Sequence, residues 1–574
     1  MSTPAVAVLP PCRLASVTPI PARPTWRSAP DGPIPRWRPV DKICQRQPFV
    51  VPRRMATVAV AAPARQVEQR EEEATGDEKF VWEKHWYPIV PLKWLEEAQG
   101  EGFESGLPQI QRQTILGRDI VVWKDAEGKW RAVEDRCSHR LAALSLGSVQ
   151  KDGTLACRYH GWCFNGRGEC THIPQATDGT SEATACSSTR SKILAFPTLQ
   201  AGGLLWVWPD DSPTSWVDAA ATEPKLGKVT SPDVDWMVTD IPTSYMNWVE
   251  NAFDPTHADH VHHGQNAFGV AFRREHAFLV KEFRQTRKTT AEGGFTVNHT
   301  PVTADTQGQN TTVDFQPPTL AATEALIKGM VNINLSVHHV PMHPGRTRLL
   351  LASSMEAKED KGKAVLKAVM AVQKLQTFIR ELPLMLLPGY VRTGLRHACG
   401  GQAGVPNGLL VQDIAVIHSE YVQLARSKAD WKSQYYLPSP GDNGVLIFRK
   451  WLHTLAGGEP NWVRGGTEED FKADNEAEVY NKWNRHSRQC PHCRKALKFL
   501  GGLNSLLGKA TVGLLGVAVA LAIFRTANPH MAVVATVAAG MAIVVRLETQ
   551  RLCNKFVTDL PYSGMPEFRF GWAS

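Results

Sequence analysis

Two short Cys/His pairs constrain this chain more than any other feature of its sequence. Cys137-Ser-His139 is followed by a second pair, Cys157-Arg-Tyr-His160. Each pair places one thiolate and one imidazole in a single loop, and two such loops facing each other can clamp a two-iron cluster. In a Rieske [2Fe–2S] cluster, two thiolates hold one iron and two imidazoles hold the other. We therefore predict that Cys137, His139, Cys157 and His160 bind such a cluster.

A Cys₂His₂ zinc site and unrelated core residues are the alternatives to this interpretation. Zinc fingers usually group like ligands, as C-x-x-C followed by H-x₃₋₅-H. Here each half mixes Cys with His, which favours the iron–sulfur cluster. A glycine turn and apolar residues that could wrap a cluster follow the second pair, from Gly161 to Asn165.

The composition indicates a folded protein of two or three domains. The chain has 574 residues, of which 43% are hydrophobic and 21% charged. The chain has eleven cysteines, which is an odd number, and several of them lie in motifs that serve other roles than disulfide bonds. We therefore expect the mature protein to reside in a reducing compartment. We expect no nucleic-acid partner.

The N-terminal stretch at 1–65 resembles a targeting leader more than a domain. It contains ten Lys/Arg and only two acids, Asp31 and Asp41, with much Pro, Ala and Val. An Arg-rich, acid-poor leader without a long apolar run indicates an organelle transit peptide, cleaved near Arg54 to Arg65. A disordered basic tail is the alternative. Residues 66–79 are acidic and are expected to form a solvated linker.

Two folded regions are expected to follow. Residues 80–210 carry strand patterns at 117–123, 130–134 and 203–209, so we predict a small all-β domain with the cluster loops at one end. Residues 211–485 are expected to form an α+β domain, with strands at 346–351 and 444–448. A helical stretch at 361–386 is interrupted near Pro383 and Pro388.

A second iron site is predicted in the histidine-rich run from Asn247 to Gly264. Two imidazoles and one carboxylate form the facial triad of non-haem Fe(II) oxygenases, which leaves one face of the metal open. His257 and His262 are the predicted imidazole ligands, and Asp254 lies where it could hydrogen-bond a ligand. His260 and His263 complicate this choice, and a surface histidine cluster is the alternative.

These motifs resemble those of one family of oxygenases. Arg140-Leu141-Ala142 and Tyr159-His160-Gly161-Trp162 resemble Rieske domains of ring-hydroxylating and tetrapyrrole oxygenases. The second run resembles the motif E-N-x-x-D-P-x-H-x₄-H-x-G of the group that includes pheophorbide a oxygenase, chlorophyllide a oxygenase and Rieske proteins of the plastid import machinery. The residues that match are Glu250, Asn251, Asp254, Pro255, His257, His262 and Gly264. The resemblance covers residue 80 to the C-terminus.

The resemblance implies several residue roles. His257 and His262 are expected to bind iron, and Asp254 to carry electrons between neighbouring subunits of a head-to-tail homotrimer. The catalytic domain is expected to be helix-grip-like. The segment from Asn407 to Ile417 resembles the one that bears the third iron ligand, for which we predict Asp413 with Glu420 as the runner-up. A helix-start acid is the alternative for Asp413.

Cys490-Pro-His-Cys493 forms a C-x-x-C pair near the C-terminus. Zinc would need two more ligands, and the sequence shows no second pair nearby. We therefore expect a redox-switchable dithiol that thioredoxin could reduce. Within the family, such a pair is typical of the pheophorbide and import-machinery branch, whereas chlorophyllide a oxygenase generally lacks it.

Two apolar runs after this pair predict a helical hairpin that crosses a membrane. The runs cover 510–524 and 531–545, with a short loop at 525–530 and basic residues on both flanks. The positive-inside rule then places both ends on the stromal side. A buried core hairpin is the alternative. The expected order is thus a leader (1–65), an acidic linker (66–79), a Rieske domain (80–210), a mononuclear-iron domain (211–485), a C-x-x-C segment (486–498), a transmembrane hairpin (499–545) and a tail (546–574).

The resemblance implies a ferredoxin-dependent enzyme that inserts oxygen from O₂ into a chlorophyll-derived tetrapyrrole, similar to pheophorbide a oxygenase. It would act in the chloroplast, at the inner envelope or thylakoid membrane, with its catalytic domains facing the stroma. The alternatives are a chlorophyllide a or protochlorophyllide oxygenase, or a redox-sensing Rieske subunit of the import machinery.

Overall fold

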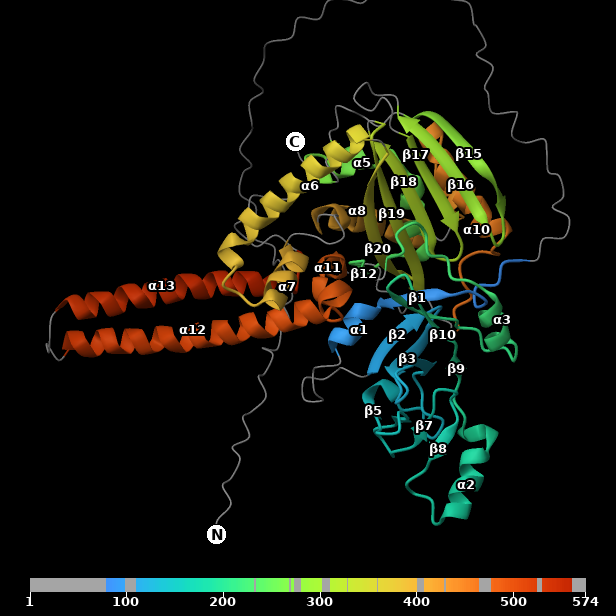
Figure 1. Cartoon of the computed structure of the whole chain (residues 1–574), viewed down its shortest axis with the longest axis horizontal. Helices are drawn as coiled ribbons and strands as arrows, with labels where there is room; N and C mark the ends of the chain where they lie inside the picture. The colour runs from blue at the N-terminus through green and yellow to red at the C-terminus, as the bar shows by residue number, and fades with distance from the viewer. Residues whose placement is uncertain are drawn as a thin grey trace, which may run out of the picture. The chain divides into compact units, whose positions relative to one another are not determined.

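The computed structural model describes residues 79–98, 110–231, 234–267, 270–272, 280–301, 310–327, 329–358, 360–399, 407–427, 430–463, 476–523 and 529–559. The predicted leader, nearly all of the acidic linker and most of the predicted hairpin loop lie outside these residues. The described part contains a β-rich N-terminal region, a large antiparallel sheet with helices, and two long C-terminal helices (Figure 1). The predicted α+β class is confirmed.

The N-terminal region consists of three small antiparallel sheets, with orders β2-β3-β4-β9, β5-β6-β7-β8 and β1-β11-β10. Cys137 follows β4, and Cys157 lies between β6 and β7. The predicted strands at 117–123, 130–134 and 203–209 correspond to β3, β4 and β11. The bounds are β1 (Tyr87–Pro91), β2 (Ile110–Ile115), β3 (Arg118–Lys124), β4 (Trp130–Glu134), β5 (Ser148–Val149), β6 (Leu155–Ala156), β7 (Cys163–Phe164), β8 (Cys170–His172), β9 (Ala195–Phe196), β10 (Thr198–Ala201) and β11 (Leu204–Val207).

A tight turn links the N-terminal region to the large sheet. Leu116 and Gly117 both have positive φ, 52° and 76°, as a two-residue hairpin turn requires. The backbone N–H of Leu116 donates to the carbonyl of Pro341 at 2.9 Å, and that of Gly117 donates to Met342 at 2.6 Å. The turn between β2 and β3 is therefore hydrogen-bonded to the end of β19.

The large sheet has seven antiparallel strands in the order β12-β20-β19-β18-β17-β16-β15. From β15 onward each strand pairs with the next along the chain, whereas β12 pairs with the distant β20, where Met237 lies opposite Leu351. The bounds are β12 (Met237–Ile241), β15 (Val280–Thr290), β16 (Gly294–Pro301), β17 (Asn310–Gln316), β18 (Leu320–Ile327), β19 (Val331–His343) and β20 (Arg346–Ala357).

Helices α4 (Tyr245–Glu250), α8 (Asn407–Ser427) and α10 (Asn443–Thr454) pack beside one another and against this sheet. Aromatic side chains fill the contact. The rings of Phe315 and Trp451 are 4.8 Å apart, and those of Phe253 and Phe448 are 5.6 Å apart. This core fixes α4 and α8, from which the candidate active site is built.

The expected strand at 444–448 is wrong, because these residues belong to α10. The apolar run Val-Leu-Ile-Phe is too short to distinguish a strand from a buried helix by itself. Its continuation decides the outcome: Val445, Phe448, Trp451 and Leu452 are buried at helical spacing. A capping box between Ser439 and Asp442 marks the short turn that leads into the helix.

The helical stretch predicted at 361–386 is confirmed as α6 (Asp360–Glu381), followed by a 3₁₀ turn at Leu382–Leu384 and by α7 (Gly389–Cys399). The interruption coincides with the two prolines, which cannot donate a helical hydrogen bond. The shorter elements are α1 (Leu92–Ala98), α2 (Gly179–Ser187), α3 (Ser215–Ala221), α5 (Ala258–Val261), β13 (Asn266–Ala267), β14 (Val270–Ala271), α9 (Trp431–Gln434) and α11 (Glu476–Tyr480).

The two C-terminal helices, α12 (Pro491–Ile523) and α13 (Pro529–Asn554), run side by side (Figure 1). Both are long and apolar enough to cross a membrane, and each contains an 18-residue stretch of high mean hydropathy, 2.1 in α12 and 1.8 in α13. Their apolar side chains are mostly exposed, as Val512 and Val544 illustrate. Both helices are longer than the predicted apolar runs. α12 begins before its run and α13 continues after its run, in both cases with turns that contain polar residues.

Candidate metal centres and active-site cavity

The two loops that carry the predicted cluster ligands are closed by the same hydrogen bonds. The N–H of Cys137 donates to the carbonyl of Ala142 at 2.9 Å, and that of Cys157 donates to Trp162 at 2.8 Å. In each loop the N–H four residues after the cysteine donates back to the cysteine carbonyl, at 2.9 Å in both cases. The matching turns present each Cys and its following His to the other loop.

The four side chains suit a two-iron cluster with one buried and one outer iron. Cys137 and Cys157 are buried, whereas His139 and His160 are partly exposed, with ring centroids 4.6 Å apart. Trp162 stacks on His139 at 4.7 Å, and Nδ1 of His139 is buried without a hydrogen-bond partner. A buried imidazole nitrogen that has no hydrogen-bond partner is free to bind a metal ion.

The structure brings His257, His262 and Asp413 together, with one potential ligand atom from each within 4.8 Å of the others. The two histidines flank α5, one at each end, and Asp413 comes from α8. Oδ1 of Asp413 lies 3.2 Å from Nε2 of His262 and 3.7 Å from Nε2 of His257. That oxygen is buried and has no hydrogen-bond partner of good geometry. Three converging electron-pair donors of this kind fit a divalent cation.

Each histidine of this group is oriented through its other ring nitrogen. Nδ1 of His257 donates to the backbone carbonyl of Asp254 at 2.7 Å, and Nδ1 of His262 donates to Oε1 of Gln412 at 3.1 Å. Both bonds leave Nε2 free to face the carboxylate. Such outer hydrogen bonds fix the tautomer and the ring orientation of metal-binding histidines.

The remaining candidates of the histidine-rich run lie outside this group. His260 and His263 are exposed. The Asp254 carboxylate accepts hydrogen bonds from the N–H and the hydroxyl of Thr256, at 2.8 and 2.6 Å. Its Oδ2 is 3.8 Å from Nδ1 of His257. Asp254 is therefore placed beside an imidazole of the group, with its side chain one-third exposed.

Glu420, the runner-up for the third ligand, belongs to a separate polar network. It accepts a hydrogen bond from Nδ2 of Asn247 at 3.1 Å and another from the hydroxyl of Tyr435. Glu250 forms a bidentate pair with Arg449, with distances of 2.7 and 2.8 Å. Burial raises the pKa of Glu250 to about 8, although the Arg449 guanidinium opposes this shift.

A cavity of about 350 Å³ joins the metal group to this network. Its lining combines His257 and Asp413 with aliphatic and aromatic side chains. The other lining residues are Asn247, Glu250, Asn251, Asp254, Val261, Val416, Ile417, Glu420, Tyr435, Tyr436, Leu437, Asp442 and Val445. The lining thus mixes aliphatic and aromatic side chains with many carboxylate and amide groups, and small-molecule sites use convergent polar groups to orient their ligands.

Sequence reasoning did not identify several residues of this site. Gln412 directly precedes Asp413, so the polar pair at the start of α8 was an available signal. Asn247 lies at the start of the recognised run. Tyr435 lines the cavity and Arg449 pairs with Glu250 beside it. Neither carried a sequence signal, because tertiary packing alone brings them there.

The chain is similar to several known proteins. Residues 86–189 match the Rieske [2Fe-2S] domain. Pheophorbide a oxygenase of Oryza sativa is 28% identical over 456 residues, covering 76% of this chain and 78% of the relative. Flavonoid 8-hydroxylase 2 of Ocimum basilicum is 25% identical, covering 81% and 83% of the two chains. Protochlorophyllide-dependent translocon component 52 of Arabidopsis thaliana is 26% identical, covering 75% and 76%.

Among solved structures, the NdmA QL mutant of Pseudomonas putida CBB5 with theobromine has a TM-score of 0.43 and 20% identity, and covers 65% of this chain and 91% of that chain. The Rieske domain and the named relatives together identify the larger group. The chain contains a Rieske [2Fe-2S] domain and is similar over most of its length to Rieske-type oxygenases, a group that includes pheophorbide a oxygenase, chlorophyllide a oxygenase and the Rieske proteins of the plastid import machinery.

Proposed function

We propose that this chain is a ferredoxin-dependent oxygenase that inserts oxygen from O₂ into a chlorophyll-derived tetrapyrrole. Pheophorbide a is the first candidate substrate, with chlorophyllide a and protochlorophyllide as alternatives. The observation that carries the proposal is the His257/His262/Asp413 group on a cavity of about 350 Å³, in a chain that also has a Rieske domain. Relatives named pheophorbide a oxygenase in two plants support the substrate class.

In this proposal, different residues bind the two metal centres. Cys137, Cys157, His139 and His160 would hold the Rieske cluster, and the other two histidines with Asp413 would hold one iron(II). Iron(II) in such a triad supplies O₂ activation at its open coordination positions. The backbone carbonyl of Asp254 and the amide of Gln412 orient the two imidazoles, while aliphatic and aromatic lining residues such as Ile417 and Tyr436 offer apolar contact to the substrate.

Asp254 is also the proposed route for electrons between subunits of a head-to-tail homotrimer. Its one-third-exposed carboxylate lies beside His257 and can contact another subunit. On the cluster side, Leu141 and Tyr159 are exposed next to the two partly exposed histidines. Apolar side chains around the outer iron support a face to which a catalytic domain or ferredoxin docks.

We further propose that the enzyme acts at a chloroplast membrane, inner envelope or thylakoid, with its catalytic domains in the stroma. The names of several relatives specify the chloroplast. The two apolar C-terminal helices would anchor the chain near an amphiphilic pigment, and their basic flanks would place both ends on the stromal side.

The decisive experiment is turnover of purified full-length protein with reduced ferredoxin, ¹⁸O₂ and a panel of pheophorbide a, chlorophyllide a, protochlorophyllide and a flavonoid. The proposal expects a tetrapyrrole product that carries ¹⁸O. Labelling of only the flavonoid would overturn the substrate class.

The electron route has its own test. Asp254→Asn is expected to keep both iron centres but to lower turnover by at least about 100-fold, whereas exposed His260→Gln serves as the matched control. Full turnover in Asp254→Asn with both centres loaded would refute the route.

A redox-sensing subunit of the import machinery is the second candidate, favoured by the relative named as a translocon component. A pure electron carrier needs no mononuclear iron. About three irons per chain therefore support the oxygenase and about two support the carrier. Loss of one iron per chain in His257→Gln, with an intact Rieske spectrum, would distinguish the two sites.

A further inference from the structure

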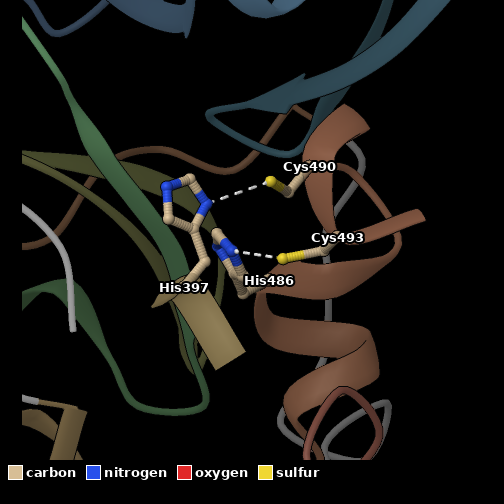
Figure 2. Close-up of side chains that lie close together, drawn as sticks. All are labelled: His397, His486, Cys490 and Cys493. Atoms are coloured by element: carbon tan, nitrogen blue, oxygen red, sulfur yellow. Dashed lines mark hydrogen bonds between the residues drawn. The ribbon is translucent and has the colours of Figure 1, made fainter. Parts of the chain in front are cut away.

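A second group of metal-ligating side chains lies away from the candidate active site. His397, His486, Cys490 and Cys493 converge in the interior (Figure 2), with one potential ligand atom from each within 4.8 Å of the others. Sγ of Cys490 lies 3.5 Å from Nδ1 of His397, and Sγ of Cys493 lies 3.4 Å from Nε2 of His486. The sequence shows no second pair beside the C-x-x-C motif, but the fold brings two histidines from other segments to it.

We propose that these four residues bind one structural Zn²⁺ ion. Tetrahedral zinc with Zn–S of about 2.3 Å and Zn–N of about 2.0 Å places neighbouring sulfur and nitrogen ligands about 3.5 Å apart. The two observed separations match this spacing. A two-iron cluster would instead separate its cysteines from its histidines across the whole rhomb, so the compact group suits a single ion.

The surroundings hold the four donors in a closed site. Nδ1 of His486 donates to the backbone carbonyl of Val238 at 2.7 Å, which directs Nε2 toward Cys493. Gly394 lets α7 approach α12 closely, because a Cβ at this position would lie 2.4 Å from Cβ of Ala496. One turn later along α7, His397 faces Cys490. Structural zinc sites are closed in this way, with every ligand supplied by the protein.

Burial also argues against the dithiol that the sequence suggested. Both cysteines have 0% exposure, whereas thiol–disulfide exchange needs an accessible sulfur. His492, between the two cysteines in sequence, instead places its Nε2 2.9 Å from Oε2 of Glu97. The C-x-x-C turn thus directs its two thiols inward and its histidine away from them.

The proposed zinc joins three segments at one point. His397 comes from α7, His486 from the turn just before α12, and the cysteines from the beginning of α12. This is where the chain leaves the large sheet for the apolar hairpin. The ion would therefore fix the direction of α12 relative to the catalytic region.

The test is the metal content of the full-length protein, purified in detergent without added zinc and measured by inductively coupled plasma mass spectrometry. We expect about one zinc per chain in addition to iron. Cys493→Ser and His486→Asn are expected to lose at least about 80% of the zinc while the Rieske spectrum persists. The controls Cys399→Ser and His492→Gln keep it.

Wild-type protein without zinc, a Cys490–Cys493 disulfide found by mass spectrometry, or zinc retained in both ligand variants would each overturn the proposal. If the variants do not fold, wild-type protein grown with Co²⁺ provides the answer. Visible absorption of tetrahedral Co²⁺ with thiolate charge-transfer bands supports the site, and absence of these bands refutes it. Iron content and turnover report separately on the proposed oxygenase.

Discussion

Gln412 accepts a hydrogen bond from His262, with Oε1 of the amide 3.1 Å from Nδ1 of the ring. The neighbouring residue along α8, Asp413, faces the other nitrogen of the same ring at 3.2 Å. Two consecutive residues of one helix thus contact both sides of one imidazole. The start of α8 therefore sets both the tautomer and the position of His262.

Replacing Gln412 tests this relationship. Gln412→Leu removes the acceptor and should weaken iron(II) binding at the triad by about 10- to 100-fold, because outer hydrogen bonds orient metal ligands. Gln412→Glu keeps an acceptor and should retain most of the affinity. Iron(II) titration of protein depleted of the mononuclear metal measures the difference, and equal affinities in the two variants would contradict the role.

The cluster loops should differ in their tolerance of side chains. Gly161 has φ of 74° and its equivalent Leu141 has φ of 61°. A Cβ on Gly161 would lie 3.0 Å from Cγ of Pro174, so Gly161→Ala should cost about 1–2 kcal/mol. Leu141→Gly removes the strained side chain and should be milder. Loss of Rieske absorbance during heating ranks the variants, and the reverse order would disprove this reading.

The buried pair of Glu250 and Arg449 supports α4 and α10. Arg449→Met leaves a buried carboxyl without its cation and should lower the free energy of unfolding by about 3–5 kcal/mol. Adding Glu250→Gln should recover part of that loss, since the buried carboxyl, whose pKa burial raises to about 8, is then replaced by a group that cannot ionise. Denaturant unfolding of the single and double variants gives the coupling. If the effects of the two substitutions on the free energy of unfolding simply add, Glu250 and Arg449 do not interact directly.

Acid should destabilise the fold through buried histidines of β19. Burial lowers the pKa of both His338 and His339 to about 3, from 6.5 in the unfolded chain. The folded state therefore binds fewer protons below pH 6.5, and its stability decreases as the pH falls from about 6.5 toward 3. The slope is at most about 1.4 kcal/mol per pH unit for each histidine.

His339 allows a direct check of this slope, because both of its ring nitrogens are buried without hydrogen-bond partners. His339→Leu should therefore flatten the dependence of the unfolding midpoint on pH between 6.5 and 4. It should do so without removing a polar contact. A variant with the wild-type slope would show that other groups control acid unfolding.

The convergence of the two Cys/His pairs could be predicted from sequence because each pair lies within one short loop. Local backbone hydrogen bonds shape such loops, so residue spacing carries the information. The same holds for His257 and His262, which flank the short α5. Asp413 could be predicted only from the family resemblance, because it lies on a separate helix that is far from the two histidines in the sequence.

Other parts depend on contacts that no local pattern encodes. His397 reaches Cys490 across 93 positions of the sequence, so the C-x-x-C pair looked incomplete. Tyr435 reaches the cavity, and Arg449 reaches Glu250 beside it, only through packing of segments that are far apart in the sequence. The apolar run at 444–448 is too short to show helical spacing. The buried residues that establish this spacing continue beyond the run to Trp451.

Helix α12 has 33 residues, which corresponds to a length of about 50 Å. A bilayer's hydrocarbon interior is only about 30 Å thick. In the proposed membrane-bound arrangement, about 20 Å of this helix would therefore lie outside the hydrocarbon interior. Cys493, Ala496 and Leu500 of α12 are buried, so the first turns of the helix belong to the folded region, and the length of α12 would set the distance between that region and the bilayer.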